Sequence, residues 1–263
     1  MLIIGESLNS SIPKTLAILE PFDEAGVRDL VRAQLSAGAE VLDINTALTS
    51  DELSLMRRVA AIVKEEGGVP MFDSPSPEVL KTMLEESEGR AFINSVTLTE
   101  RQEILPLCAA QIASGRELFI VALPVGEELP QNTGDREANV EKLMEIFAAC
   151  GIPAEHIWVD VLVEALSVNT ESANKVLAAQ TFVRERYPSV RTLCGLSNVS
   201  FGLPMRAELN RAFLCLLVSG GLSGAILNAT APSVRRTVAA LSALLGEDEY
   251  CMNYLTLYRE LEG

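Results

Sequence analysis

Carboxylate and carboxamide side chains stand at the ends of short apolar runs throughout this chain of 263 residues. Polar groups at the exit of a buried strand usually face a ligand, because the core beneath them has no use for a polar group. Any one of them could instead be a helix cap or a turn residue, but caps alone do not explain their recurrence at seven runs of eight. In chain order the polar residues are Glu6, Asn9, Asp43, Asn45, Asp73, Asn94, Ser95, Asp160, Ser197, Asn198 and Asn228.

These residue types limit the chemistry of the set. Carboxylate and carboxamide oxygens accept hydrogen bonds, so they suit a ligand rich in N–H donors, such as a fused aminopyrimidinone. No His, Lys or Cys stands at the run ends to act as a nucleophile or to form a Schiff base. The single His156 precedes the sixth run, at the opposite end, where we expect a packing or surface role. The alternative is Mg²⁺ held by Asp43 and Asp73, since hard cations favour carboxylates.

The elements that would position these residues alternate along the chain. Short apolar runs bounded by Gly, Pro, Ser or Asp predict buried parallel strands. Longer amphipathic segments between them predict helices. The predicted strands are 2–5, 40–45, 69–73, 91–94, 117–123, 157–161, 192–196 and 223–228, and the predicted helices are 24–37, 51–66, 77–86, 100–114, 135–150, 170–187, 208–219 and 233–245.

Eight strand signals and eight helix signals in about 260 residues are typical of a (β/α)8 TIM barrel. An open doubly wound sheet is the competing fold, but it more often has a Gly-rich first turn, and no G-x-G-x-x-G or P-loop sequence occurs. Without a linker or a composition shift, we expect a single domain over residues 1–263. Cap-like residues open several helices, at Ser50-Asp51, Ser76-Pro77 and Thr99-Glu100, and glycines end five of them, at Gly38, Gly67, Gly115, Gly151 and Gly220.

Composition narrows the class of protein and of partner. The formal net charge of −15, with no basic run to offset it, argues against a nucleic-acid or anionic-membrane partner. No signal peptide or membrane span is visible, so we expect a soluble cytoplasmic protein. The cysteines form neither close pairs nor a metal spacing, and they predict reduced core residues at 108, 150, 194, 215 and 251.

Several of the strand-end motifs resemble one known family, the methyltetrahydrofolate:corrinoid methyltransferases. This family includes the folate-binding module of cobalamin-dependent methionine synthase and belongs to the pterin-binding barrels, as does dihydropteroate synthase. The resemblance runs from Met1 to Leu261, and Gly195-Leu-Ser-Asn-Val-Ser-Phe-Gly202 is its most specific motif. The other motifs are Met1-Leu-Ile-Ile-Gly-Glu6, Asp43-Ile-Asn45, Phe72-Asp-Ser74, Ile93-Asn-Ser95 and Val159-Asp160.

The resemblance implies roles for individual residues. Asp73, Asn94 and Asp160 would accept hydrogen bonds from the pterin ring, and Asn198 would contact the ring near N5, which bears the methyl group. An amide cannot give up its proton at neutral pH, so Asn198 would stabilise the departing amine by a hydrogen bond, with the proton source left open. Gly195, Ser197 and Arg206 would line the pocket, with Arg206 toward the p-aminobenzoyl-glutamate side. The residues that would support the site are Glu6, Asp43, Asn45 and Asn228.

The resemblance also implies partners. The substrate would be tetrahydrofolate or 5-methyltetrahydrofolate. The corrinoid (cobalamin) would come from a separate corrinoid protein, because the Asp-x-His-x-x-Gly signature of cobalamin domains does not occur in the sequence. A homodimer is expected by analogy. The loop 125–135, with Glu127-Glu128, departs from the family pattern.

Three further questions stay open at the level of sequence. One rival activity is that of a dihydropteroate synthase, although Asn198 stands where that enzyme normally has a basic residue. The other rival is a non-catalytic folate-binding subunit of a corrinoid complex. The direction of methyl transfer is the third open point, because the cobalt potential of the partner largely decides it.

Overall fold

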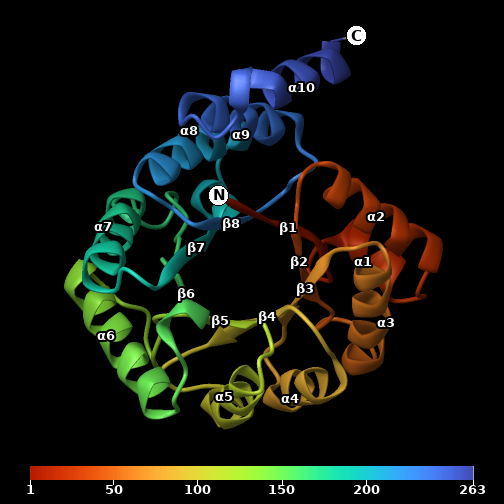
Figure 1. The fold of residues 1–263 in the computed structure, drawn as a ribbon. Coiled ribbons are helices and arrows are strands. Elements are labelled where there is room, and N and C mark those ends of the chain that lie inside the picture. Colours follow the sequence, from red (N-terminus) through yellow and green to blue (C-terminus); the bar gives the residue numbers. More distant parts are fainter. Residues whose placement is uncertain (263) are drawn as a thin grey trace.

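Eight parallel strands close into a barrel in sequence order, with β8 paired to β1 (Figure 1). The computed structural model describes residues 1–262, with side chains described through Glu260. The predicted (β/α)8 barrel is confirmed, and each predicted strand is present. Their bounds are β1 (Leu2–Asn9), β2 (Val41–Asn45), β3 (Val69–Asp73), β4 (Ala91–Val96), β5 (Leu118–Ala122), β6 (Ile157–Asp160), β7 (Arg191–Gly195) and β8 (Gly224–Leu227).

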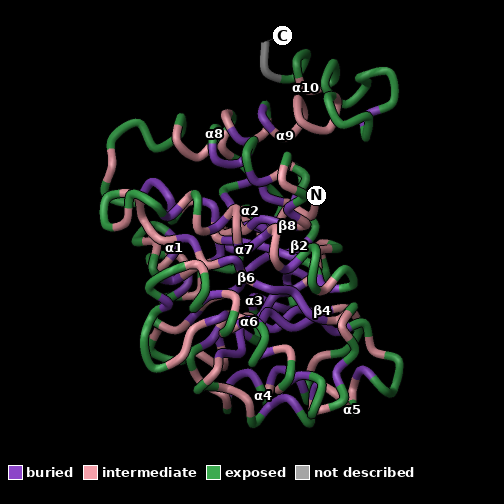
Figure 2. Tube along the Cα trace, turned by 90° about the vertical axis from the view of Figure 1, so that its left-hand side faces the viewer, coloured by how far each residue is buried: buried purple, intermediate pink, exposed green. Residues whose placement is uncertain are grey.

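The helices form a ring outside the strands, and the strands lie at the buried centre (Figures 1 and 2). Two helices were not predicted: α1, in the loop after β1, and α10, which projects beyond the ring near the C-terminus. The helices are α1 (Pro13–Leu19), α2 (Glu24–Ser36), α3 (Glu52–Glu65), α4 (Pro77–Glu86), α5 (Leu105–Ala113), α6 (Thr133–Ala149), α7 (Ser172–Arg186), α8 (Arg206–Ser219), α9 (Pro232–Leu244) and α10 (Met252–Glu262).

Helix boundaries follow local chemistry, with three corrections to the predicted signals. Asp51 and Ser76 cap α3 and α4, as predicted. Thr99 does not cap a helix; the Thr97 hydroxyl accepts the N–H of residue 100 instead. After α8 the left-handed position falls on Gly221, with φ of 92°, and not on Gly220. The third correction is that 100–114 divides into a 3-10 turn and α5, because Pro106 lies in the first turn of α5.

Two apolar clusters build the molecule. The larger packs the strands against the helices. The smaller fills the barrel lumen, and its buried members are Ile4, Val41, Met71, Phe92, Phe119, Val121, Trp158 and Leu193. Because side chains alternate along a strand, the residue two positions after each member also points into the lumen, nearer the carboxyl end. For six of these members that residue is, in order, Glu6, Asp43, Asp73, Asn94, Asp160 and Gly195.

All five cysteines are free thiols, but the expectation that they belong to the core holds only in part. Cys108 and Cys194 are buried and Cys150 is partly exposed, whereas Cys215 and Cys251 are exposed. On helix α8, Phe213, Leu214 and Leu217 are buried, whereas Leu216 is 52% exposed. Over the described part of the chain, none of the helices is long and apolar enough to cross a membrane.

Candidate functional site

Three of the predicted residues lie side by side in one layer at the carboxyl ends of β2, β3 and β4. Asn45 is in register with Asp73, and Asp73 with Asn94. Asn45 Nδ2 donates a hydrogen bond to Asp73 Oδ2 at 2.8 Å. This bond fixes one carboxyl oxygen of Asp73 and leaves lone pairs of the group free to face a ligand.

Asp43 lies one layer deeper, on the lumen side of β2. It is only 3% exposed, and its Oδ1 accepts a hydrogen bond from Asn94 Nδ2 at 3.1 Å. Burial raises the pKa of Asp43 well above its usual range, and the charge of Asp73 adds to that rise. Burial also raises the pKa of Asp73, against the Asn45 hydrogen bond and the Arg101 charge, which lower it. Because each charge disfavours the other, one of these two carboxyl groups tends to stay protonated while the other is ionised.

Asp160 ends β6, two residues after the buried Trp158. Its Oδ1 accepts the backbone N–H of Leu162 at 2.8 Å. Burial raises the pKa of Asp160 to about 6, although the Leu162 hydrogen bond and the Arg136 charge act in the opposite direction. Asp160 is thus ionised above about pH 6 and can then accept N–H groups from a ligand.

Residues from the first and seventh strands meet at the next part of the mouth. Ser197, in the 3-10 turn Leu196–Ser200, donates its hydroxyl to the carboxyl group of Glu6 on β1. Arg206 at the start of α8 holds the same turn, donating from Nη2 to the Ser197 carbonyl at 2.9 Å and from Nε to Ser200 Oγ at 3.1 Å. Burial raises the pKa of Glu6, while the Ser197 hydrogen bond and the Arg206 charge lower it.

Asn198 is exposed on this turn, and its side-chain amide has no hydrogen-bond partner among the described residues. It lies over Gly195, where an added Cβ would come 3.0 Å from Asn198 Nδ2. The backbone of Gly195 is extended, with φ of −78°, a conformation that any residue can adopt. Glycine is therefore needed here to leave room for the Asn198 side chain, and not for its backbone freedom. The amide is therefore available to a ligand.

Two of the polar strand-end residues act mainly in their own turns. Asn228 Oδ1 accepts both the N–H and the hydroxyl of Thr230, and Asn9 Oδ1 accepts the N–H of Ser11. Among the described residues neither side chain is bonded to the other site residues. His156 lies at the opposite end of β6, where its Nδ1 contacts the Leu118 carbonyl and its ring stacks on Phe119, as the packing role predicts.

The structure adds two arginines that sequence reasoning missed. Arg101, on the loop after β4, bonds to the Ser95 carbonyl, and its charge lowers the pKa of Asp73. Arg136, in the first turn of α6, is fully buried behind Asp160. Arg136 lies on the apolar face of its helix. A charged residue on such a face is unusual, and this feature of the sequence could have identified Arg136 as a functional candidate. The other members of that face are Val140, Leu143 and Phe147.

The site is a set of acceptors above an apolar floor, with one free amide at its edge. This arrangement can hold a flat heterocycle through its N–H groups and leave one ring atom within reach of Asn198. Among the residues whose side chains the structure describes, no group of three or more His, Cys, Asp or Glu is placed to hold a metal ion. Asp43 and Asp73 by themselves supply fewer oxygen ligands than Mg²⁺ takes.

Comparisons with known proteins identify the family. A family model described as "Pterin binding enzyme" matches residues 8–228. The chain is 32% identical over 265 residues to the methylcorrinoid:tetrahydrofolate methyltransferase of Eubacterium limosum, and the match covers 99% of this chain and 97% of that protein. It is 29% identical to the methionine synthase of Mycobacterium tuberculosis over 88% of this chain and 20% of that longer protein.

Among solved structures, a dihydropteroate synthase from Thermus thermophilus has a TM-score of 0.66 at 17% identity, over 93% of each chain, which shows a shared fold. The family model and the nearly full-length relative decide the family and confirm the one expected from the strand-end motifs. The chain belongs to the pterin-binding enzymes and, within them, to the methylcorrinoid:tetrahydrofolate methyltransferases.

Proposed function

We propose that this chain moves a methyl group between N5 of 5-methyltetrahydrofolate and the cobalt(I) of a corrinoid carried by a separate protein. The observation that carries the proposal is the layer of acceptors at the ends of β2, β3, β4 and β6, directly above the apolar floor of the lumen. A pterin ring offers several N–H donors on one edge and an apolar face, so it complements both features. The printed name of the Eubacterium limosum relative supports the same substrates.

In this proposal the pterin N–H groups bind to Asp73, Asn94 and Asp160. The contacts to Asn45 and Asp43 orient the first two of these side chains. Gly195, Ser197 and Arg206 line the side of the pocket next to Asn198. The supporting set is Glu6, Asp43, Asn45 and Asn228, although the Asn228 side chain serves its own turn.

Asn198 acts on the leaving group. Loss of the methyl group turns the tertiary amine at N5 into an anion, or into a secondary amine if a proton is added, so the group leaves poorly unless N5 gains a proton or a strong hydrogen bond. Asn198 Nδ2 can donate such a bond, and the bond strengthens as negative charge develops on N5 toward the transition state. The amide keeps its own proton, so the proton comes either from solvent or from a neighbouring carboxyl group.

Glu6 is our candidate for that carboxyl group. It bonds to Ser197, the residue that precedes Asn198, and burial raises its pKa. A Glu with a raised pKa holds a proton at higher pH than an exposed Glu does, and general acids work best when their pKa lies near the working pH. The return transfer, from methylcorrinoid to tetrahydrofolate, would use the same groups in reverse.

One experiment separates this function from its rivals. The protein is mixed anaerobically with 5-methyltetrahydrofolate and cob(I)alamin, and the cobalt spectrum is followed in a single turnover. Conversion of cobalt(I) to methylcobalt that requires both the folate and the protein is the expected result. Folate binding without a change at cobalt would favour a non-catalytic subunit, and condensation of a pterin diphosphate with p-aminobenzoate would favour a dihydropteroate synthase.

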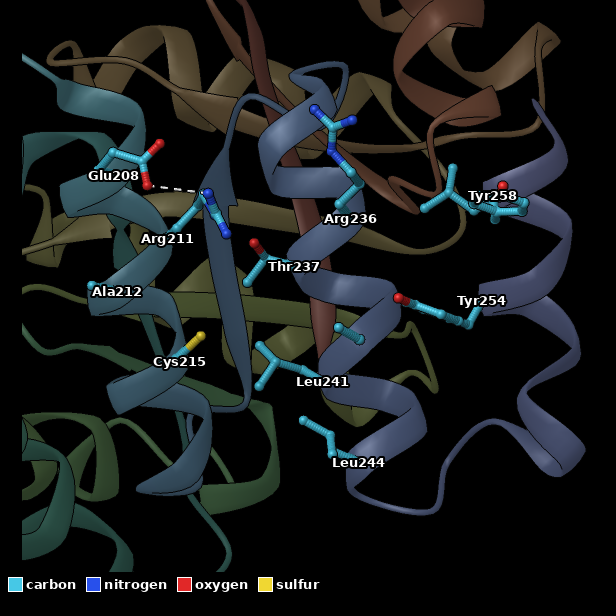
Figure 3. Close-up of a pocket in the computed structure, with 12 residues that line it drawn as sticks. Glu208, Arg211, Ala212, Cys215, Arg236, Thr237, Leu241, Leu244, Tyr254 and Tyr258 are labelled. Atoms are coloured by element: carbon cyan, nitrogen blue, oxygen red, sulfur yellow. Dashed lines mark hydrogen bonds and ion pairs between the residues drawn. The ribbon is translucent and has the colours of Figure 1, made fainter. Parts of the chain in front are cut away.

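We also propose that the chain forms a homodimer through the outer face of α8, α9 and α10. A groove of 490 Å³ lies between these helices (Figure 3). Leu244 is 82% exposed and Tyr258 62% exposed, both beside the groove, and exposed apolar patches of this kind mark interaction sites. The groove and the exposed side chains of α10 lie on the same face of the molecule. In a dimer with a two-fold axis, this face of each copy could therefore cover the same face of the other.

Analytical ultracentrifugation tests the dimer at micromolar concentration. We expect a dimer for the native chain and a monomer for Leu244→Glu, because a charge would be buried at the contact. A native chain that sediments as a monomer at this concentration would rule the dimer out.

A further inference from the structure

We propose that Arg136 is the positioning residue for Asp160: it fixes the bend after β6 and thereby the direction of the Asp160 carboxylate. Arg136 comes from the first turn of α6 and is fully buried. Neither burial nor position favours a cation there, because the N-terminus of a helix carries the positive end of its dipole and burial penalises charge. Its contacts must therefore offset these two penalties.

All of these contacts go to the segment that follows Asp160. Arg136 Nη1 donates to the carbonyl oxygens of Val161 at 3.0 Å and Leu162 at 2.6 Å. Nη2 bonds to the carboxylate of Glu164. The planar guanidinium thus binds three acceptors in a row, which a lysine ammonium cannot match in geometry.

Leu162 connects the arginine to the site. Its φ of 56° lies in the left-handed region, which a residue with a branched side chain rarely adopts without support. Its carbonyl accepts from Arg136, and its N–H donates to Asp160 Oδ1 at 2.8 Å. Both backbone polar groups of this one residue are therefore fixed, one by the arginine and one by the acid.

The charge of Arg136 also reaches Asp160. The Cys194 thiol of β7 also interacts with Asp160, and burial together with the Asp160 charge raises the pKa of that thiol. The thiol is therefore neutral at physiological pH. Glu164, on the same loop, is bound by Arg136. Arg136 is thus the cation that holds the pKa of Asp160 down, against the burial that raises it to about 6.

The inference rests on the proposed function in one respect, the role of Asp160 as a pterin acceptor, and its test separates the two. The first readout uses no folate: the Asp160 carboxyl is titrated by ¹³C NMR in the ligand-free protein, with the resonance assigned by Asp160→Asn. Arg136→Met should raise the pKa of Asp160 by roughly 0.5–1 unit, since an opposite charge is removed from its surroundings. Glu164→Gln should lower it, because Arg136 then keeps its charge without an anionic neighbour.

The second readout is folate affinity against pH. In the native protein the affinity should fall as pH drops below about 6, when Asp160 becomes protonated. Arg136→Met should shift this fall to higher pH. Arg136→Lys should return the midpoint to the native value while leaving the affinity lower by roughly fivefold at every pH, because charge is restored without the fork geometry.

The outcomes are distinct. If the native protein binds no folate, the proposed function fails, and the NMR titration still decides the role of Arg136. If Arg136→Met does not fold, Glu164→Gln provides the titration. A pKa of Asp160 that stays unchanged in every folded variant overturns the inference, as does an Arg136→Lys protein with native affinity throughout.

Discussion

Ser197 Oγ bonds to both carboxyl oxygens of Glu6, at 3.0 and 3.1 Å, although 191 residues separate the two in sequence. This contact joins the first strand to the turn that carries Asn198. It places a partly buried carboxyl group, whose pKa is raised by burial, against the residue that precedes Asn198. Under the proposed function, we expect this contact to be part of the route by which a proton reaches N5.

Replacing Glu6 by Gln tests this route. The variant keeps the shape and the hydrogen-bond capacity of the side chain but cannot deliver a proton, so methyl transfer from folate should slow by about 10²-fold, the size of a general-acid effect. Folate affinity should change little, because the pterin acceptors are untouched. Single-turnover spectroscopy at cobalt measures the rate, and fluorescence titration measures the affinity.

Ser197→Ala is the matched control for Glu6. The Ser197 hydrogen bond lowers the pKa of Glu6, so its loss should raise that pKa further. The alkaline limb of the transfer rate should then move to higher pH, and the same limb should be absent in Glu6→Gln. Native pH profiles in both variants would show that Glu6 is not the proton donor.

Asn198→Ala should lower the single-turnover rate by roughly 10²–10³, which is the usual effect of losing one preorganised donor. The side chain is exposed and has no described partner within the protein, so the fold should remain stable. Circular dichroism checks the fold, and stopped-flow spectroscopy follows the methyl transfer. A rate within about threefold of the native one would remove Asn198 from the mechanism.

Gly195 and Gly224 form a matched pair for separating site geometry from core packing. A Cβ at Gly195 would lie 3.0 Å from Asn198 Nδ2, and the exposed amide can move aside. Gly195→Ala should therefore slow transfer by about tenfold or more through misplacement of the amide, with stability changed by about 0.5 kcal/mol at most.

A Cβ at Gly224 would lie 2.8 Å from Cζ3 of the buried Trp158 ring, which cannot move aside. Gly224→Ala should destabilise the fold by about 1–3 kcal/mol and leave the transfer rate of the folded molecule unchanged. Urea unfolding and single-turnover rates measured on both variants give the comparison. The reverse result, a slow Gly224→Ala and an unaffected Gly195→Ala, would contradict the assignment.

Sequence predicted the barrel and which polar side chains lie at its mouth, because both depend on short-range patterns. In the strands, period-two alternation places the residue two positions after a lumen residue at the mouth, so Asp73 follows Met71 and Asp160 follows Trp158. These pairs can be read directly from the chain. The hydrogen bonds between them could not be predicted, since Asn94 bonds to Asp43 two strands away and not to its neighbour Asp73.

Other features had no local signal. The Glu6–Ser197 contact depends on closure of the barrel, which brings β1 and β7 to either side of β8. Asn228 has the same kind of position as Asn198, but a threonine two residues later binds its side-chain oxygen in a turn. Helix α10 lies outside the barrel repeat, so the repeat could not predict it.

Asp160→Asn should make the protein more stable while weakening folate binding. The folded protein holds the pKa of Asp160 at about 6, whereas the unfolded chain has an ordinary value of about 3.9. Between these values the folded state binds the extra proton, so the stability associated with this group is complete below about pH 4 and is lost as pH rises through about 6.

At pH 7.5 the native protein therefore carries an unfavourable, poorly solvated charge that the neutral amide lacks, and Asn can still accept the Leu162 N–H through its own oxygen. We expect the variant to be about 1–2 kcal/mol more stable at pH 7.5 and no more stable than native at pH 4. Urea unfolding at the two pH values measures the difference. A variant less stable than native at pH 7.5 would mean that the protein stabilises the ionised form of Asp160, and that this charge does not reduce the stability of the fold.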